Sequence, residues 1–229
     1  MLQADAQLEV KHLSYCRCDQ ALFHDLNFSI SAGGILQIVG ANGTGKTTLL
    51  RIIAGLITVE HGSLLWCGKD IQHYNSEFNK QMAYLGHQLG ISLSLTPLEN
   101  LQIASALHAI KTKSIDHYLD KFNLLAYANN LTGHLSAGQQ RGVALACLLI
   151  RQAQLWILDE PLASLDQAGS ALIEHLLIDH VNNGGLAIIT THQAISLPQL
   201  SIQRLELRSN VIPARESFDK YIELSSGNL

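Results

Sequence analysis

The sequence lacks the two features that direct a chain into or across a membrane. No apolar run among its 229 residues reaches the roughly eighteen residues that a spanning helix requires. The first residues also lack the charged segment followed by an apolar one that marks a secretory signal. We therefore expect a protein of the cytoplasm.

Charge and cysteine are scarce as well. The formal net charge is −4, and the 15 lysines and arginines are scattered instead of gathered in a basic patch. Such a distribution does not favour binding to nucleic acid. Four cysteines in a chain of this length do not make a disulfide framework. With 47% hydrophobic residues, the composition predicts one globular α/β domain, or one such domain with an inserted lobe.

One glycine-rich stretch has a recognisable chemistry. Residues 40–47 read GANGTGKT, after the apolar run ILQIV and before the helical run TTLLRIIAGL. This order matches the phosphate-binding loop G-x-x-x-x-G-K-[ST], in which backbone N–H groups and a helix N-terminus face phosphate oxygens. Lys46 is expected to reach the β- and γ-phosphates of a nucleotide, and the Thr47 hydroxyl to bind Mg²⁺. The alternative is a glycine turn that carries Lys-Thr by chance. The residues expected to cradle the nucleotide are Gly40, Ala41, Asn42, Gly43, Thr44, Gly45, Lys46, Thr47 and Thr48.

The segments on either side of this loop predict β hairpins and a helical lobe. Residues 8–15 and 21–30 show partial apolar alternation around a polar turn, which indicates an antiparallel hairpin. Residues 59–71 alternate similarly between glycines and indicate a second hairpin, and residues 82–85 a brief buried strand. From 98 to 130 apolar residues recur at helical spacing, so we expect a helical lobe inserted into the α/β core.

The second half of the chain predicts buried strands that end in polar groups. Ser136 precedes an apolar helix as an N-cap residue, so its loop presents a second helix N-terminus suited to an anion. The run QLWILD is a buried strand that ends in Asp159, followed by Glu160; the alternative is a helix-capping pair of acids. The run LAIIT is expected to be a last buried strand, and His192 follows close to its end. Polar groups at one edge are typical of a parallel sheet with a site there.

Together, and in this order, the phosphate loop, LSAGQ, WILDEP, ASLD and TTH resemble the ATP-binding subunits of ABC transporters. The resemblance covers about residues 8–208 and implies a P-loop NTPase core, a mainly parallel sheet flanked by helices. It also implies an N-terminal antiparallel β subdomain and a helical lobe at about residues 90–150, so that residues 1–208 form one nucleotide-binding domain. The tail, residues 209–229, carries no motif that we can interpret.

The resemblance also assigns catalytic roles. Glu160 is similar to the general base that activates the attacking water, and His192 to the switch histidine that contacts the γ-phosphate. Lys46 and Gln88 complete the implied catalytic set, Gln88 in the loop that faces a membrane partner. The implied Mg²⁺ ligands are Thr47, Gln88 and Asp159.

Further residues are implied to contact the nucleotide or the neighbouring chain. Ser136, Gly138 and Gln139 resemble the signature loop, and Asp166 the acid of the adjacent D-loop. Tyr15 resembles the aromatic residue that stacks on adenine, although its position alone favours packing within a strand equally well. The chain has one phosphate loop and one signature loop, which point in different directions in this fold. The resemblance therefore implies a homodimer in which each signature loop closes over the partner's ATP.

Flanking residues point to one branch of the family. The runs YLGHQLG, LSAGQQR, LWILDEP and TTHQ are similar to the ATPase of the cytochrome c maturation system, often called the heme exporter. That likeness implies integral membrane partners and a peripheral position at the cytoplasmic face of the inner membrane. The alternatives are a transport ATPase with another cargo, a soluble ABC ATPase such as an iron–sulfur assembly factor, and a P-loop kinase or regulatory module. Gly142 and Cys147 depart from the family, which commonly has arginine in this helix.

Overall fold

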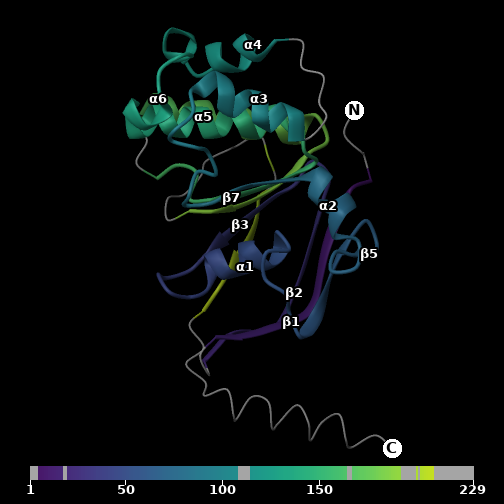
Figure 1. Ribbon diagram of the computed structural model, residues 1–229. Helices are drawn as coiled ribbons and strands as arrows, with labels where there is room; N and C mark the ends of the chain where they lie inside the picture. The colour runs from purple at the N-terminus through teal and green to yellow at the C-terminus, as the bar shows by residue number, and fades with distance from the viewer. Residues whose placement is uncertain are drawn as a thin grey trace, which may run out of the picture.

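The computed structural model describes residues 5–17, 20–107, 114–163, 167–191, 200 and 202–208. A four-stranded sheet and a five-stranded sheet lie side by side, and helices cover the five-stranded sheet (Figure 1). The elements are β1 (Gln7–Arg17), β2 (Gln20–Ser31), β3 (Ile35–Val39), α1 (Lys46–Ile53), β4 (His61–Trp66), β5 (Lys69–Asp70), α2 (Asn75–Gln81), β6 (Met82–Leu85), α3 (Pro97–Leu107), α4 (Ile115–Asp120), the 3₁₀ turns η1 (Leu125–Tyr127) and η2 (Thr132–His134), α5 (Ala137–Ile150), β7 (Leu155–Asp159), α6 (Gln167–Asn182), β8 (Leu186–Thr190) and β9 (Ile202–Glu206).

The four-stranded sheet has the order β2-β1-β4-β5, and every neighbouring pair is antiparallel. Both predicted hairpins are therefore confirmed, as β1–β2 and β4–β5. Leu8 lies opposite Ile30 on β2 and opposite Trp66 on β4, and all three side chains are buried. This row of apolar side chains gives the sheet one face that packs on the rest of the core.

The five-stranded sheet has the order β6-β7-β8-β3-β9, and all its neighbours are parallel. The predicted parallel sheet is confirmed, and β8 is its last buried strand, as predicted. β9 follows it and pairs with β3 at the edge of the sheet. Sequence analysis missed β9 because its run IQRLE is mostly exposed, with only Ile202 and Leu205 partly buried. An edge strand of this kind lacks the continuous apolar run by which a buried parallel strand is recognised.

Alternate residues of the parallel strands face two different layers. Those facing α1 and the antiparallel sheet include Leu36, Ile38, Leu155, Ile157, Leu186 and Ile188. Those facing α5 and α6 include Ile35, Trp156, Leu158, Ala187 and Ile189. The phosphate-loop helix and the signature helix thus cover opposite faces of one sheet (Figure 1).

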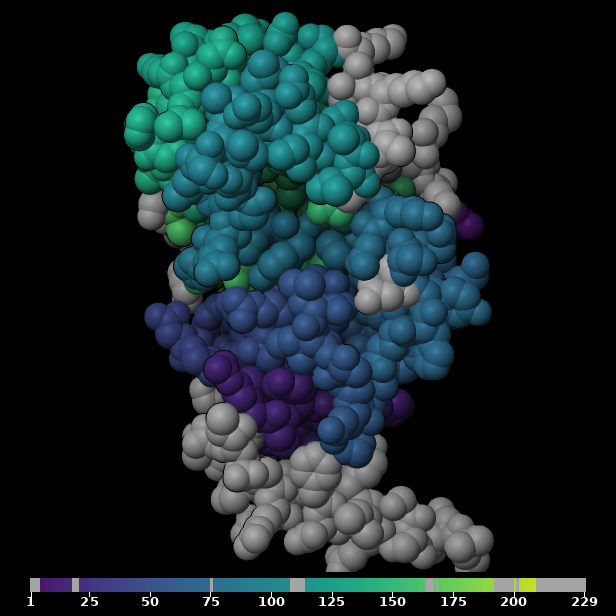
Figure 2. Space-filling model, in the orientation of Figure 1, coloured from purple at the N-terminus to yellow at the C-terminus, as the bar shows by residue number. Residues whose placement is uncertain are grey.

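A third apolar cluster joins α3, α4 and α5 into the expected helical lobe. Its buried members are Leu101, Leu119, Leu124, Leu135, Val143, Ala146 and Ile150. In the space-filling view this teal lobe lies above the blue atoms around α1 and the purple N-terminal strands (Figure 2). The helical nature of the segment is confirmed, whereas the bounds of about 90–150 stay a prediction. The tail of residues 209–229 lies outside the described residues.

Gly142 lies in the middle of α5, where it is buried against the lobe. A Cβ at this position would lie 3.4 Å from Leu124 Cδ1 and 3.4 Å from Phe122 Cβ, which is ordinary contact. Glycine in a helix interior costs about 1 kcal/mol relative to alanine. We therefore expect Gly142→Ala to raise the melting temperature by about 2–4 °C. A melting temperature below that of the wild type would show that close packing against Phe122 outweighs the gain in backbone entropy.

His180 on α6 is a buried titratable group far along the chain from the phosphate loop. Its ring stacks on Trp156 with the centroids 3.9 Å apart and the planes at 8°, and its Nε2 lies 3.2 Å from the Leu186 carbonyl oxygen. Burial lowers the pKa of His180 to about 4, although hydrogen bonds to the backbone of Leu186 and Gln154 act in the opposite direction. The folded protein therefore holds this ring neutral.

Acid should destabilise the fold through His180. The pKa in the folded state is about 4 and the ordinary value is 6.5, so between these values only the unfolded chain takes up the proton. Stability is thus full above pH 6.5 and falls as the pH drops toward 4, by about 2 kcal/mol between pH 7 and pH 5. Urea titrations at pH 7 and pH 5 measure this loss of unfolding free energy. His180→Phe keeps a stacked ring but has no group that titrates there, so its loss between the two pH values should be smaller by about 2 kcal/mol. Equal acid sensitivity of both proteins would contradict this assignment.

Candidate nucleotide site

The phosphate loop links the carboxyl end of β3 to the N-terminus of α1. Gly45 is the N-cap of α1 with φ +95°, a left-handed conformation that side chains with a Cβ rarely adopt. A Cβ at Gly40 would lie 2.5 Å from the Leu207 carbonyl oxygen and 2.7 Å from Thr44 Oγ1, so no side chain fits there. These two glycines let the backbone turn tightly in front of the helix, and α1 directs its unpaired N–H groups into the loop.

Lys46 lies inside this loop. It is only 7% exposed, and its Nζ donates to the carbonyl oxygens of Gly40 at 2.8 Å and Ala41 at 3.0 Å. The buried hydroxyl of Thr44 donates to the same Ala41 carbonyl at 2.9 Å, whereas Asn42 is exposed. The remaining predicted members, Gly43, Thr47 and Thr48, belong to the same loop and helix start. The ammonium is thus held at the mouth of a helix N-terminus, an arrangement that suits the phosphates of a nucleotide.

Two further oxygen ligands meet beside this helix. Thr47 Oγ1 donates to Asp159 Oδ2 at 2.8 Å, which joins the start of α1 to the end of β7. Asp159 is 2% exposed, and its other oxygen, Oδ1, accepts a hydrogen bond from Thr190 Oγ1 at 2.6 Å. A hydroxyl and a carboxylate at this distance are the oxygen donors that Mg²⁺ prefers, so Thr47 and Asp159 fit such an ion.

Glu160 directly follows Asp159 with an unusual backbone. Its φ is +50°, in the left-handed region that residues other than glycine rarely occupy. Its N–H donates to Thr190 Oγ1 at 2.9 Å and lies 3.2 Å from the Thr190 carbonyl oxygen, and its own carbonyl accepts from Arg141 at 2.6 Å. The carboxylate oxygen Oε2 lies 3.9 Å from Nε2 of His87, the residue before Gln88. Hydrogen bonds therefore hold the backbone of Glu160 and fix the position from which its side chain extends.

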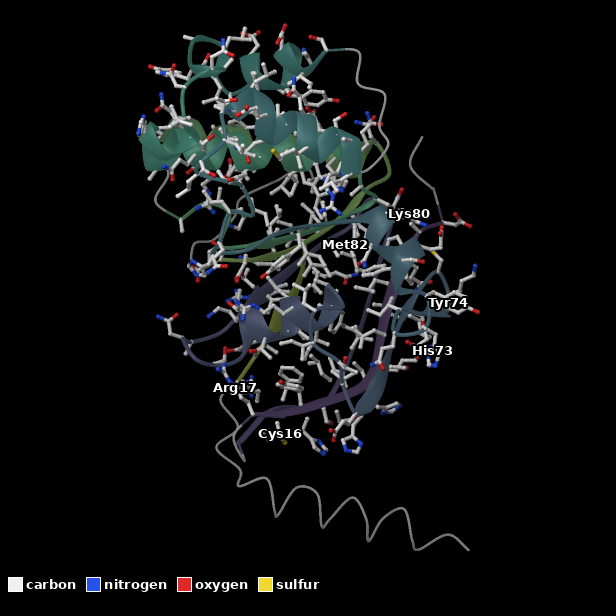
Figure 3. All side chains as sticks on the ribbon, viewed as in Figure 1. Cys16, Arg17, His73, Tyr74, Lys80 and Met82 are labelled. Atoms are coloured by element: carbon white, nitrogen blue, oxygen red, sulfur yellow. The ribbon has the colours of Figure 1, made fainter. Side chains whose placement is uncertain are left out.

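Gln88 and Tyr15 lie at the rim of this region. Gln88 is exposed and follows β6, whose carboxyl end lies at the same edge of the sheet as that of β7. Tyr15 stacks on Phe23 across β1 and β2 with the ring centroids 6.0 Å apart, and Phe23 in turn lies against Gly45. Figure 3 places Cys16 and Arg17, the residues after Tyr15, on the side of the parallel sheet that α1 covers. The structure thus brings Tyr15 close to the phosphate loop, through Phe23. The ring of Tyr15 is already stacked on one side by Phe23 of the neighbouring strand.

The signature segment forms the N-terminus of α5. The Ser136 Oγ accepts from the Gln139 N–H at 3.3 Å, and Gln139 Oε1 accepts from the Ser136 N–H at 3.0 Å. This reciprocal capping box confirms Ser136 as the N-cap residue. Gly138 is exposed and has open space where a Cβ would lie, so a partner molecule can approach the backbone closely.

Two predicted site residues, His192 and Asp166, lie outside the described residues. Three residues with a part in the geometry were not predicted: Thr190, Arg141 and His87. Thr190 carried a usable signal, because it is the one polar residue of the buried run LAIIT. Arg141 and His87 carried none, since their contacts join segments that are distant in the sequence.

Comparison with known proteins places the chain in a family. The model of the ABC transporter family matches residues 23–163. The cytochrome c biogenesis ATP-binding export protein CcmA of Vibrio cholerae serotype O1 is 44% identical over 202 residues, covering 87% of this chain and 98% of that protein. The protein of the same name from Methylococcus capsulatus is 42% identical over 196 residues, covering 85% and 95%. The chain belongs to the ABC transporter family.

A solved structure agrees with this ABC-type fold. An ATP-binding subunit of an ABC transporter superposes with a TM-score of 0.79 at 24% identity, covering 95% of this chain and 99% of that one. The chain is accordingly an ABC-type ATPase that binds ATP, with a parallel sheet, an antiparallel sheet and helices as in its structural relatives. Within the part of the chain that the structure describes, no helix has the length and apolar character to cross a bilayer.

Proposed function

We propose that this ABC ATPase powers an exporter that serves cytochrome c biogenesis, with heme as the cargo that the system handles. The observation that carries the proposal is the identity of 44% over 98% of the length of a cytochrome c biogenesis export protein. Likeness over the whole length of a relative supports a shared task better than likeness within the ATP-binding motifs, because those motifs are common to the family.

The described contacts support a division of labour in hydrolysis. Lys46 and the loop N–H groups bind and neutralise the phosphates, and Tyr15 stacks on the adenine. Thr47 and Asp159 would hold Mg²⁺, with the exposed Gln88 as a further proposed ligand, and the ion would supply positive charge beside the phosphates. Glu160 accepts a proton from the attacking water. The role of His192 at the γ-phosphate is proposed from the family resemblance alone, since this residue lies outside the described residues.

A homodimer completes this site. The phosphate-loop helix and the signature helix cover opposite faces of the parallel sheet, so the signature loop of a chain does not lie over the nucleotide at its own phosphate loop. In the proposed dimer, Ser136, Gly138 and Gln139 of each chain lie against the γ-phosphate bound by the other. The exposed N-terminus of α5 suits that contact, because its N–H groups favour an anion.

An apolar groove supports the proposed membrane partner; the peripheral position at the cytoplasmic face of the inner membrane is proposed from the family resemblance. A cavity of about 300 Å³ lies between β6, α3 and α5, and Leu89, in the segment after Gln88, forms part of its wall. Ile103 and Leu107 on α3 are 46% and 76% exposed at this groove. The surface is hollowed between the teal helical lobe and the blue atoms below it (Figure 2). In this proposal, apolar side chains from a helix of an integral membrane subunit enter the groove, between the Gln88 segment and the lobe.

Deletion of this chain tests the proposal. The deletion should abolish mature c-type cytochromes and leave b-type heme proteins at normal levels. Heme would still be synthesised, but it would no longer be delivered for covalent attachment to c-type cytochromes. Heme staining of denaturing gels measures the first, and optical spectra of membranes the second. The wild-type chain expressed from a plasmid should restore the c-type signal. Normal c-type cytochromes in the deletion would contradict the proposal and leave an ABC ATPase with another cargo.

A further inference from the structure

Arg141 joins the signature helix to the turn that carries Glu160. It lies two residues after Gln139 on α5 and is half-buried. Its Nη2 donates to the Glu160 carbonyl oxygen at 2.6 Å, and its Nη1 donates to the Ala163 carbonyl oxygen at 3.1 Å. A guanidinium presents its donors at fixed spacing in one plane, so this one side chain holds two points of the turn in a fixed relation.

The turn needs such support because Glu160 is strained. A glutamate with φ +50° persists only where its surroundings define the conformation from several sides. Thr190 fixes the N–H of Glu160, and Arg141 fixes its carbonyl oxygen. The peptide groups on both sides of the Glu160 Cα are therefore held, and with them the direction in which the carboxylate leaves the backbone.

Arg141 is costly to place here. Its Nε is buried without a hydrogen-bond partner, and burial lowers the pKa of the guanidinium, an effect opposed by the charge of Glu160. An anchor for α5 alone would not need a charged group, since the helix already packs on the sheet through Ala144, Leu145 and Leu148. The arginine therefore has a reason beyond the packing of its helix.

We propose that Arg141 is a positioning residue for hydrolysis, which aligns Glu160 with the attacking water through the backbone of the turn. This inference rests on the proposed role of Glu160 as the general base. Since Arg141 is on the signature helix, any shift of α5 on closure over the partner's ATP passes directly to the base. Closure of the dimer and alignment of Glu160 with the attacking water would then occur together.

The same helix offers a matched control. Arg151, the C-cap of α5, also donates from one Nη2 to two carbonyl oxygens, those of Met82 at 2.7 Å and Asn79 at 3.2 Å. Its Nε is likewise buried without a partner, and burial likewise lowers the pKa of its guanidinium. Arg151 holds the start of β6, however, at the opposite end of the strands from Glu160. Its loss removes the same kind of contact without touching the turn.

The test compares Arg141→Met, Arg141→Lys and Arg151→Met in the full-length chain. We expect Arg141→Met to lower kcat by about 10- to 100-fold, because a small displacement of a catalytic group has effects of this size. The Kd for ATP should change by less than about threefold, since the phosphate loop is untouched. Arg141→Lys, which can reach the Glu160 carbonyl with one ammonium, should give an intermediate kcat. We expect Arg151→Met to lower the melting temperature about as much as Arg141→Met does and to retain the wild-type kcat.

A second measurement separates alignment from closure. Arg141→Met combined with Glu160→Gln should still form the ATP-bound dimer, because binding and closure do not need the base. Wild-type kcat in Arg141→Met, equal losses of kcat in Arg141→Met and Arg151→Met, or absence of the dimer in the double variant would each overturn the inference. If Glu160→Gln itself hydrolysed ATP normally, the proposed role of Glu160 would fail; if only Arg141→Met did, Glu160 would keep its role and the inference alone would fail.

Discussion

Lys46→Ala is expected to lower ATP hydrolysis by about 100-fold or more and to weaken ATP binding by about tenfold. Lys46 brings the one side-chain ammonium that the structure shows within the phosphate loop, where it contacts the carbonyl oxygens of Gly40 and Ala41. Alanine leaves the loop N–H groups and the end of α1 in place, so some affinity for phosphate persists. The negative charge that develops on the γ-phosphoryl group loses its nearest positive partner, and turnover therefore falls further than binding.

Phosphate release and the binding of a fluorescent ATP analogue measure the two effects. Lys80→Ala is the control, since Lys80 is 68% exposed and pairs with Glu77 on α2 (Figure 3). This control removes the same charge without contact to the loop and should behave as the wild type. Thermal melts without nucleotide establish that Lys46→Ala is folded. Wild-type turnover in a folded Lys46→Ala protein would remove the assignment of the phosphate loop.

Glu160→Gln is expected to bind ATP with unchanged affinity and to lose hydrolysis by about 100-fold or more. The amide has the shape of the carboxylate and accepts no proton from water. The backbone contacts of residue 160 with Thr190 and Arg141 involve main-chain atoms, so the substitution keeps them. With MgATP bound and not hydrolysed, the proposed dimer should accumulate instead of forming transiently.

Light scattering after size-exclusion chromatography detects that dimer. Glu160→Gln should elute as a dimer in saturating MgATP and as a monomer without it, whereas the wild type should return to monomer as ATP is consumed. Glu77→Gln, at a carboxylate that is 65% exposed, controls for the loss of one charge. A Glu160→Gln protein that stays monomeric in saturating MgATP would count against shared sites between two chains.

Sequence alone predicted those parts of the molecule in which neighbouring residues decide the outcome. The spacing of the phosphate loop, the N-cap at Ser136 and the apolar run before Asp159 each depend on a few consecutive residues, and all three lie where predicted. Strand β9 was not predicted, because its own residues do not show the pattern of a strand. It forms through its hydrogen bonds with β3. Propensity and pattern report local preferences, and an edge strand depends on what lies beside it.

The network around Glu160 could not be predicted for a related reason. Thr190 and Arg141 are separated from Glu160 by 30 and 19 positions, and the pairing of β7 with β8 and the packing of α5 on the sheet bring the three together. The left-handed φ of Glu160 is also invisible in the run LDEP, since glutamate does not favour it. The residue types predicted the chemistry of the site. The contacts that hold Glu160 in place could be identified only from the fold.

The residues that follow the edge strand β9 lie directly against the phosphate loop. The Leu207 N–H donates to the Val39 carbonyl at 2.8 Å, and the Leu207 carbonyl lies so close to Gly40 that no Cβ would fit between them. Residue 208 is thus attached, within one peptide, to the wall of the phosphate loop. Because the Leu207 carbonyl fills the space in which a side chain at residue 40 would lie, β9 forms part of the wall against which the phosphate loop turns, and a shift of this strand would alter the loop directly.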